Sequence, residues 1–279
     1  MPLRDVLVVI ENTENVAPRI AAAAALVAGD TDARIVGLYA TGYPLSTSYG
    51  DLAGWTQLVD AYMTAQRNEG TTAEAAFRQE LATRHRGGDW LYREDDATLA
   101  TTALAAQYDI VVMGQPDPEA STGDLVGLQP EQVVLGCGRP VLVVPYAGNF
   151  VEIGKRVLVA WNATREAARA LHDAMPLLER AEGVTVIEVD PPGSIAGVVR
   201  LTAEDVAAGL SARGIAATAE TETAGDISVD DLLLSRAADR GVDLLVMGGY
   251  GHSRLREFVM GGVSRGIFQH MTVPVLMSH

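Results

Sequence analysis

The chain has 279 residues, 48% of them hydrophobic, which is enough for about two ordinary domains with packed cores. The net charge of −15 would repel nucleic-acid backbones and anionic membranes, so neither is expected as a partner. The single cysteine, Cys137, excludes an intramolecular disulfide, and no segment resembles a signal peptide or a membrane span, so a cytoplasmic protein is expected.

Short β-branched runs alternate with helix-like stretches along the whole chain, a pattern typical of α/β proteins. Continuous apolar runs such as residues 110–113 indicate parallel strands that helices cover on both faces. Strands are predicted, in chain order, at residues 5–10, 34–39, 90–93, 109–113, 140–145, 156–161, 183–189, 217–222, 243–247 and 273–277.

The second half of the chain repeats the first. The run DIVVMG that ends at Gly114 resembles DLLVMG ending at Gly248, a shift of 134, whereas the opening strands are related by a shift of 151. A constant register over such distances indicates a duplication, with domains at residues 1–147 and 153–279. The short linker between them implies domains that pack together.

The two shifts differ by about 17 residues, which we place in the segment 41–68 of the first half. Its aromatic residues, Tyr43, Tyr49, Trp55 and Tyr62, could line a pocket beneath a lid, as an enzyme would need. A helix that covers the core or docks a partner also accounts for them and is the preferred interpretation.

A glycine-rich loop follows the predicted strand 243–247. Glycines at Gly248, Gly249 and Gly251 precede Gly261 and Gly262, and a helix is predicted from residue 263 to residue 270. Glycines allow main-chain N–H groups to approach a polyanion, and the start of a helix adds unpaired donors and a partial positive charge. The pattern therefore predicts a phosphate-binding loop.

The spacing G-x2-G-x9-G resembles the nucleotide loop of the universal stress protein family, and the resemblance extends over both halves of the chain. It implies two tandem five-stranded parallel α/β domains, Rossmann-like and similar to the adenine nucleotide alpha hydrolases. It also implies a pseudo-dimer joined through the last strands, with a homodimer of tandem chains as a further possibility. Some family members bind ATP through this loop, with Mg²⁺ as the accompanying ion.

Carried onto this sequence, the resemblance places the phosphates against Gly248, Gly251 and Gly261. Two departures from the ATP-binding pattern weaken the case: Gly262 replaces a hydroxyl residue, and Asn162 replaces an aspartate. Trp161 could also crowd the base. The expected nucleotide-binding residues of the second domain are Ala160, Asn162, Val189, Gly248, Gly251, His252, Gly261, Gly262, Val263 and Ser264.

The first half departs further from the ATP-binding pattern. Asp117 stands where the second half has Gly251, and Pro130 stands where it has Ser264. Glu11 takes the place of Asn162, and Leu128 takes the place of Gly262. A stiffened, acidic loop would repel phosphates, so the first domain is expected to be degenerate for nucleotide binding.

Catalytic motifs are absent from the sequence. Lys155 is the only lysine, which excludes a P-loop, and the five histidines show no metal-ligand spacing on one helix face. Acidic clusters at residues 94–96 and 230–231 precede helix-like runs and are explained by helix stabilisation. We expect a non-catalytic or slowly hydrolysing stress-response regulator or scaffold; the alternative is an interaction module that needs no nucleotide.

Overall fold

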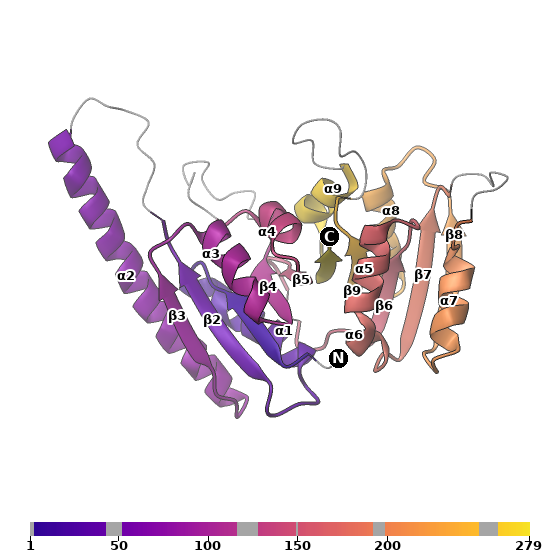
Figure 1. Ribbon diagram of the computed structural model, residues 1–279, viewed down its shortest axis with the longest axis horizontal. Helices are drawn as coiled ribbons and strands as arrows, with labels where there is room; N and C mark the ends of the chain where they lie inside the picture. The colour runs from indigo at the N-terminus through magenta and orange to yellow at the C-terminus, as the bar shows by residue number, and fades with distance from the viewer. Residues whose placement is uncertain (1–2, 43–51, 116–127, 149, 192–198, 251–261) are drawn as a thin grey trace.

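The computed structural model describes residues 3–42, 52–115, 128–148, 150–191, 199–250 and 262–279. In this part of the chain, ten strands form one continuous sheet in the order β3-β2-β1-β4-β5-β10-β9-β6-β7-β8 (Figure 1). Neighbouring strands are parallel within each half, and each half has the strand order 3-2-1-4-5. The predicted fold class, two tandem α/β domains in a pseudo-dimer, is confirmed.

Each half alternates strands with helices along the chain. The described elements of the first half are β1 (Asp5–Val9), η1 (Thr13–Asn15), α1 (Val16–Leu26), β2 (Arg34–Ala40), α2 (Leu52–Thr83), β3 (Asp89–Arg93), α3 (Ala97–Leu104), η2 (Ala105–Gln107), β4 (Ile110–Gly114), α4 (Pro130–Gly136) and β5 (Val141–Val144). Those of the second half are β6 (Arg156–Ala160), α5 (Arg165–Asp173), α6 (Met175–Leu178), β7 (Gly183–Val189), α7 (Ala203–Ser211), β8 (Ala217–Glu222), α8 (Val229–Asp239), β9 (Leu244–Gly248), α9 (Gly262–His270) and β10 (Val275–Ser278).

All ten predicted strands are present. The bounds of β7 and β8 agree with the prediction, and the other strands differ from it by one or two residues at one or both ends. The buried strands β1, β4, β9 and β10 have side chains that are inaccessible on both faces, which explains their continuous apolar sequences.

The two halves join through their last strands. Strand β10 pairs antiparallel with β5, and Leu276 lies opposite Leu142 at the centre of the pair. Hydrogen bonds reinforce the junction, because Gln115 Nε2 donates to Phe268 O over 2.8 Å and Arg180 Nη2 donates to Ala25 O over 2.9 Å. The hydrophobic core on each face of the sheet draws residues from both halves, so the domains form one packed body.

The insertion of the first half is built into α2, which has 32 residues where α7 of the second half has nine. Its later turns bury Ala73, Phe77 and Leu81 in the core beside α1. In Figure 1, the N-terminal end of α2 extends past the carboxyl end of the sheet. The later part of α2 therefore covers the core; of the segment's aromatics, Tyr62 is half-buried, and Tyr43, Tyr49 and the Trp55 side chain lie outside the described residues.

The helix α2 is long, but it does not meet the requirements for a membrane span. None of the helices among the described residues is both long enough and apolar enough to cross a bilayer.

Candidate functional site

A cavity of about 220 Å³ lies at the carboxyl ends of β6, β7 and β9 in the second half. The chain runs outward from β6 through β7 to β8 and then returns to β9 on the other side of β6, so the strand order reverses between β6 and β9. Ligands of open α/β sheets bind at such reversals. The lining residues are Ala160, Trp161, Asn162, Ile187, Val189, Val229, Leu233, Met247, Gly248, Tyr250, Gly262, Val263 and Ser264.

Strand alternation explains the apolar wall of the cavity. Ala160, Ile187 and Val189 point to the face of the sheet that α8 and α9 cover. Val229 and Leu233 are one helical turn apart on α8, so they present one apolar stripe to these strands. The wall suits a flat, weakly polar group such as a heterocyclic base.

Asn162 supplies a polar group at the exposed edge of the cavity. Its Oδ1 accepts hydrogen bonds from Thr164 N over 3.3 Å and from Thr164 Oγ1 over 2.8 Å. A backbone N–H can only donate, so the oxygen of the amide must face Thr164. No described residue accepts from the Asn162 Nδ2 group, which leaves two donors for a ligand.

The start of α9 forms the opposite edge of the cavity. The helix begins at exposed Gly262, and the first N–H groups of a helix have no intrahelical acceptor. Ser264, only 4% exposed, accepts a hydrogen bond from Tyr250 N over 3.4 Å. Its hydroxyl therefore ties Tyr250, just after β9, to the helix that follows, and the first N–H groups of α9 lie at the edge of the cavity, where a partial positive charge is expected.

Gly248, the last residue of β9, allows a close approach between β9 and α5. A Cβ at this position would lie 2.5 Å from Ala167 N and 2.6 Å from the carbonyl carbon of Glu166. Both are backbone atoms of the first turn of α5, whose N-cap is Thr164. The need for glycine at this position follows from packing and is present without any ligand.

Three strained residues surround the site. Ala163, Asp190 and Tyr250 have φ angles of 57°, 48° and 61°, and they follow the strands β6, β7 and β9. Side chains rarely adopt this left-handed conformation, and strain of this kind concentrates at ligand-binding sites. In the described part of the first half, the only other such non-glycine residue is His85, just after α2.

Tyr250 links the cavity to the first domain. Its hydroxyl is buried without a hydrogen-bond partner among the described residues. Burial raises the pKa of this phenol, and the charge of Glu131 on α4 raises the pKa further. Beside it, a Cβ on Gly249 would lie 2.9 Å from Val134 Cγ1 of α4. The residues that follow β9 therefore contact both the cavity and the first domain.

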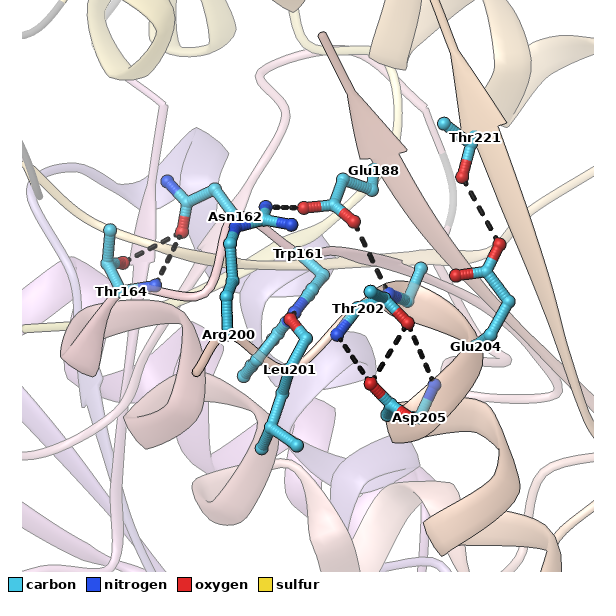
Figure 2. A network of polar contacts seen from close by, with 11 residues as sticks. Trp161, Asn162, Thr164, Glu188, Arg200, Leu201, Thr202, Glu204, Asp205 and Thr221 are labelled. Carbon is cyan, nitrogen blue, oxygen red and sulfur yellow. Dashed lines mark hydrogen bonds and ion pairs between the residues drawn. The ribbon is translucent and has the colours of Figure 1, made fainter. Parts of the chain in front are cut away.

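On the opposite face of the sheet from the cavity, a network of polar contacts joins the carboxyl ends of β6 and β7 to the segment before α7 (Figure 2). Trp161 belongs to the core on that face, and its Nε1 donates to Leu201 O over 2.9 Å. Glu188, only 2% exposed, forms an ion pair with Arg200 and accepts from Ala203 N. The indole of Trp161 thus packs against the segment that leads into α7.

Seven of the ten predicted site residues line the cavity: Ala160, Asn162, Val189, Gly248, Gly262, Val263 and Ser264. The other three, Gly251, His252 and Gly261, lie outside the described residues. Sequence reasoning missed Ile187, Val229, Leu233, Met247 and Tyr250, which the structure adds to the lining. Ile187 could have been found from its alternation with Val189, and the α8 pair from its helical spacing.

The equivalent place in the first half contains a buried cation. Arg19 of α1 is 3% exposed; its Nη1 donates to Val9 O over 2.6 Å, and its Nη2 pairs with Glu11. A Cβ on Gly114 would overlap this guanidinium, which lies at the carboxyl ends of β1 and β4. The residue that corresponds to Arg19 in the second half, at the shift of 151, is the small Ala170.

The residues of the first half's loop are only partly described. Asp117 and Gly127 lie outside the described residues. Leu128 packs partly buried against the core, and Pro130 is the first residue of α4.

A doubled sheet of order 3-2-1-4-5, with a cavity at the reversal of its second half, defines a tandem α/β protein of the Rossmann-like class. Sequence comparison identifies the family within this class. Residues 2–145 and 154–279 each match the universal stress protein family, so the chain belongs to that family as a tandem of two domains.

Among curated proteins, the chain is 28% identical over 183 residues to Universal stress protein Slr1230 of Synechocystis sp. (strain ATCC 27184 / PCC 6803 / Kazusa). The match covers 62% of this chain and 58% of that relative, less than two thirds of its length.

Solved structures with the same fold cover nearly the whole chain. A universal stress protein from Archaeoglobus fulgidus DSM 4304 has a TM-score of 0.69 at 17% identity, covering 99% of this chain and 96% of that one. A putative universal stress protein from Pseudomonas aeruginosa UCBPP-PA14 has a TM-score of 0.59 at 15% identity, covering 99% and 93%. At these identities the likeness concerns the fold.

Proposed function

We propose that this protein is a stress-response regulator or scaffold whose second domain binds ATP or a related adenine nucleotide as a regulatory ligand. The observation that supports the proposal is the cavity between β6, β7, β9 and α9, which gathers seven residues chosen from sequence alone. The first domain takes a structural role in this proposal.

The chemistry of the cavity suits the nucleoside part of the ligand. The base would lie against Ile187, Val189 and Leu233, and the free Nδ2 group of Asn162 would donate to a ribose hydroxyl. A volume of about 220 Å³ is below the roughly 300–1,000 Å³ of typical small-molecule sites. The phosphates would accordingly lie outside it, at the N–H groups that begin α9.

A magnesium ion would arrive with the phosphates and neutralise part of their charge. The described lining of the cavity contains no carboxylate. The residues of the cavity therefore fit the nucleoside and phosphate groups, and the ion would be held by phosphate oxygens and water.

One nucleotide is expected per chain, because the corresponding place in the first domain holds the Arg19–Glu11 ion pair. Binding in the second domain would be sensed by the first. Gly249 and Tyr250 lie at the edge of the cavity and also near Val134 and Glu131 of α4 in the first domain. A ligand that repositions these residues would alter the contact between the domains or with a partner protein.

Isothermal titration of nucleotide-stripped protein with Mg-ATP tests the proposal. The expected result is one site per chain, lost in Gly251→Asp, which copies Asp117 of the first half. Gly209→Asp is the matched control, because it adds the same charge at an exposed position of α7 where nothing lies within 4 Å of a new side chain. This control should bind as the wild type does.

The absence of binding heat from correctly folded protein would overturn the proposal. It would favour the interaction module that needs no nucleotide, which Gly262 in place of a hydroxyl residue also supports. Release of phosphate or another product at a steady rate would instead indicate an enzyme.

A further inference from the structure

The second half contains a cluster of metal-binding side chains outside the cavity. One carboxylate oxygen each from Asp230 and Asp231 and one ring nitrogen from His270 lie within 4.8 Å of one another. The two aspartates belong to the first turn of α8, and the histidine is the last residue of α9. We propose that this cluster binds a divalent transition-metal ion, with Zn²⁺ as its representative, and so links α8 to α9.

Asp230 is the residue that points to a ligand. The residue is only 9% exposed, and among the described residues none donates a hydrogen bond to its carboxylate or forms an ion pair with it. A buried carboxylate without a partner is costly, so such groups are usually paired or coordinate a cation. The carboxylate of Asp230 is therefore available to coordinate a cation.

The packing of the two helices aims this carboxylate at the cluster. Gly266 and His270 are four residues apart and thus share one face of α9. A Cβ on Gly266 would lie only 1.7 Å from Asp230 Oδ2, so the absence of a side chain lets the carboxylate lie directly on α9. The glycine directs Asp230 along the helix face that carries His270.

Asp231 contributes a second carboxylate that retains a free oxygen. Ser228 Oγ donates to Asp231 Oδ2 over 2.8 Å, and no described Arg or Lys forms an ion pair with this residue. The ligand set is then two carboxylates and one imidazole, with water in the open position. Imidazole favours zinc and its neighbours over Mg²⁺ and Ca²⁺, which prefer oxygen ligands alone.

Helix dipoles and distances agree with a cation at this point. The carboxylates are stabilised by the N-terminus of α8, and a cation near His270 is stabilised by the C-terminus of α9. Ligands bonded to tetrahedral zinc at about 2.0–2.2 Å are roughly 3.4 Å apart. Small rotations of the exposed Asp231 and His270 side chains would bring the three atoms from within 4.8 Å to this spacing.

The test uses full-length protein without a histidine tag, stripped with a chelator and kept free of nucleotide. Zn²⁺ is titrated calorimetrically, and Co²⁺ is used to report ligand geometry through its visible absorption. We expect one site per chain, a thermal midpoint that rises with Zn²⁺, and binding weakened at least about tenfold in His270→Gln and in Asp231→Asn.

Matched controls are available on the same elements and elsewhere. Asp239→Asn removes a carboxylate from the other end of α8, and His172→Gln removes an exposed histidine from the last turn of α5. Both should bind Zn²⁺ like the wild type. Asp230→Asn should lose binding and leave the metal-free protein about as stable as the wild type, because it keeps the size of the side chain and loses only a modest interaction with the N-terminus of α8.

Three results would overturn the assignment. They are no saturable binding of Zn²⁺ by folded wild-type protein, equal weakening in the control variants, and undiminished binding in His270→Gln. Since nucleotide is absent throughout, none of these results depends on whether the cavity binds ATP.

Discussion

Replacing Gly248 by alanine measures how closely β9 approaches α5. The new methyl group would lie 2.5 Å from Ala167 N and 2.6 Å from the carbonyl carbon of Glu166, well inside van der Waals contact. Both atoms belong to the backbone at the start of α5, so a side-chain rotation cannot relieve the overlap. The helix must move, and overpacking of this kind costs about 1–3 kcal/mol.

Thermal unfolding followed by circular dichroism is the direct assay. For a domain of this size, about 1 kcal/mol corresponds to roughly 2–4 °C, so Gly248→Ala should lower the midpoint by about 2–12 °C. Gly209→Ala is the control, since Gly209 is exposed within α7 and has nothing within 4 Å of a new Cβ. That change should raise stability by about 0.5–1 kcal/mol, because alanine is the better helix residue.

The two variants are expected to shift the midpoint in opposite directions. An unchanged or raised midpoint for Gly248→Ala would refute the reasoning, because it would show that α5 yields to a methyl group at no cost. Equal losses in both variants would show that any substitution of glycine is harmful in this half, irrespective of the space around it.

Three further predictions concern buried polar groups. Arg200→Met should destabilise the protein by about 3–5 kcal/mol in urea unfolding because it leaves Glu188 buried and unpaired, and the added change Glu188→Leu should recover most of the loss. Arg19→Met should cost about 2 kcal/mol in the same assay, less than a fully buried pair, because Glu11 stays partly exposed; a variant as stable as wild type would contradict this. Burial raises the pKa of the Cys137 thiol, so less thiolate forms and alkylation by iodoacetamide at pH 8 should be much slower in the folded than in the unfolded protein.

The strands could be predicted because their signal is local. Residues 110–114 and 244–248 are apolar without interruption, and both strands are buried on both faces, so the pattern and the environment agree. The extent of α2 could not be predicted in the same way. The segment 41–68 shows an insertion by its length, but a helix that projects beyond the core has little apolar periodicity to mark where it begins.

The sequence predicts those residues of the candidate site whose positions follow from the order of the strands along the chain. Asn162 lies just after β6 and Gly248 is the last residue of β9, and the carboxyl ends of parallel strands meet at one edge of the sheet. Tyr250 and Leu233 enter the cavity through the turn after β9 and the packing of α8, which depend on the fold. The cluster around Asp230 is even harder to predict from the sequence, because His270 is 40 residues away on another helix.

A glycine ends the fourth strand of each half, and in both halves it is required by packing. The requirement for this glycine therefore belongs to the fold and does not depend on ligand binding. Gly114 leaves space for the guanidinium of Arg19, whereas Gly248 leaves space for the backbone of α5. The presence of a glycine at this position is thus not evidence for nucleotide binding. What distinguishes the halves is the neighbour, a buried arginine in the first and Ala170 in the second, together with the residues that begin the following helix. Substitution of Gly248 should consequently act through stability, and substitution of Gly251 through affinity for the nucleotide.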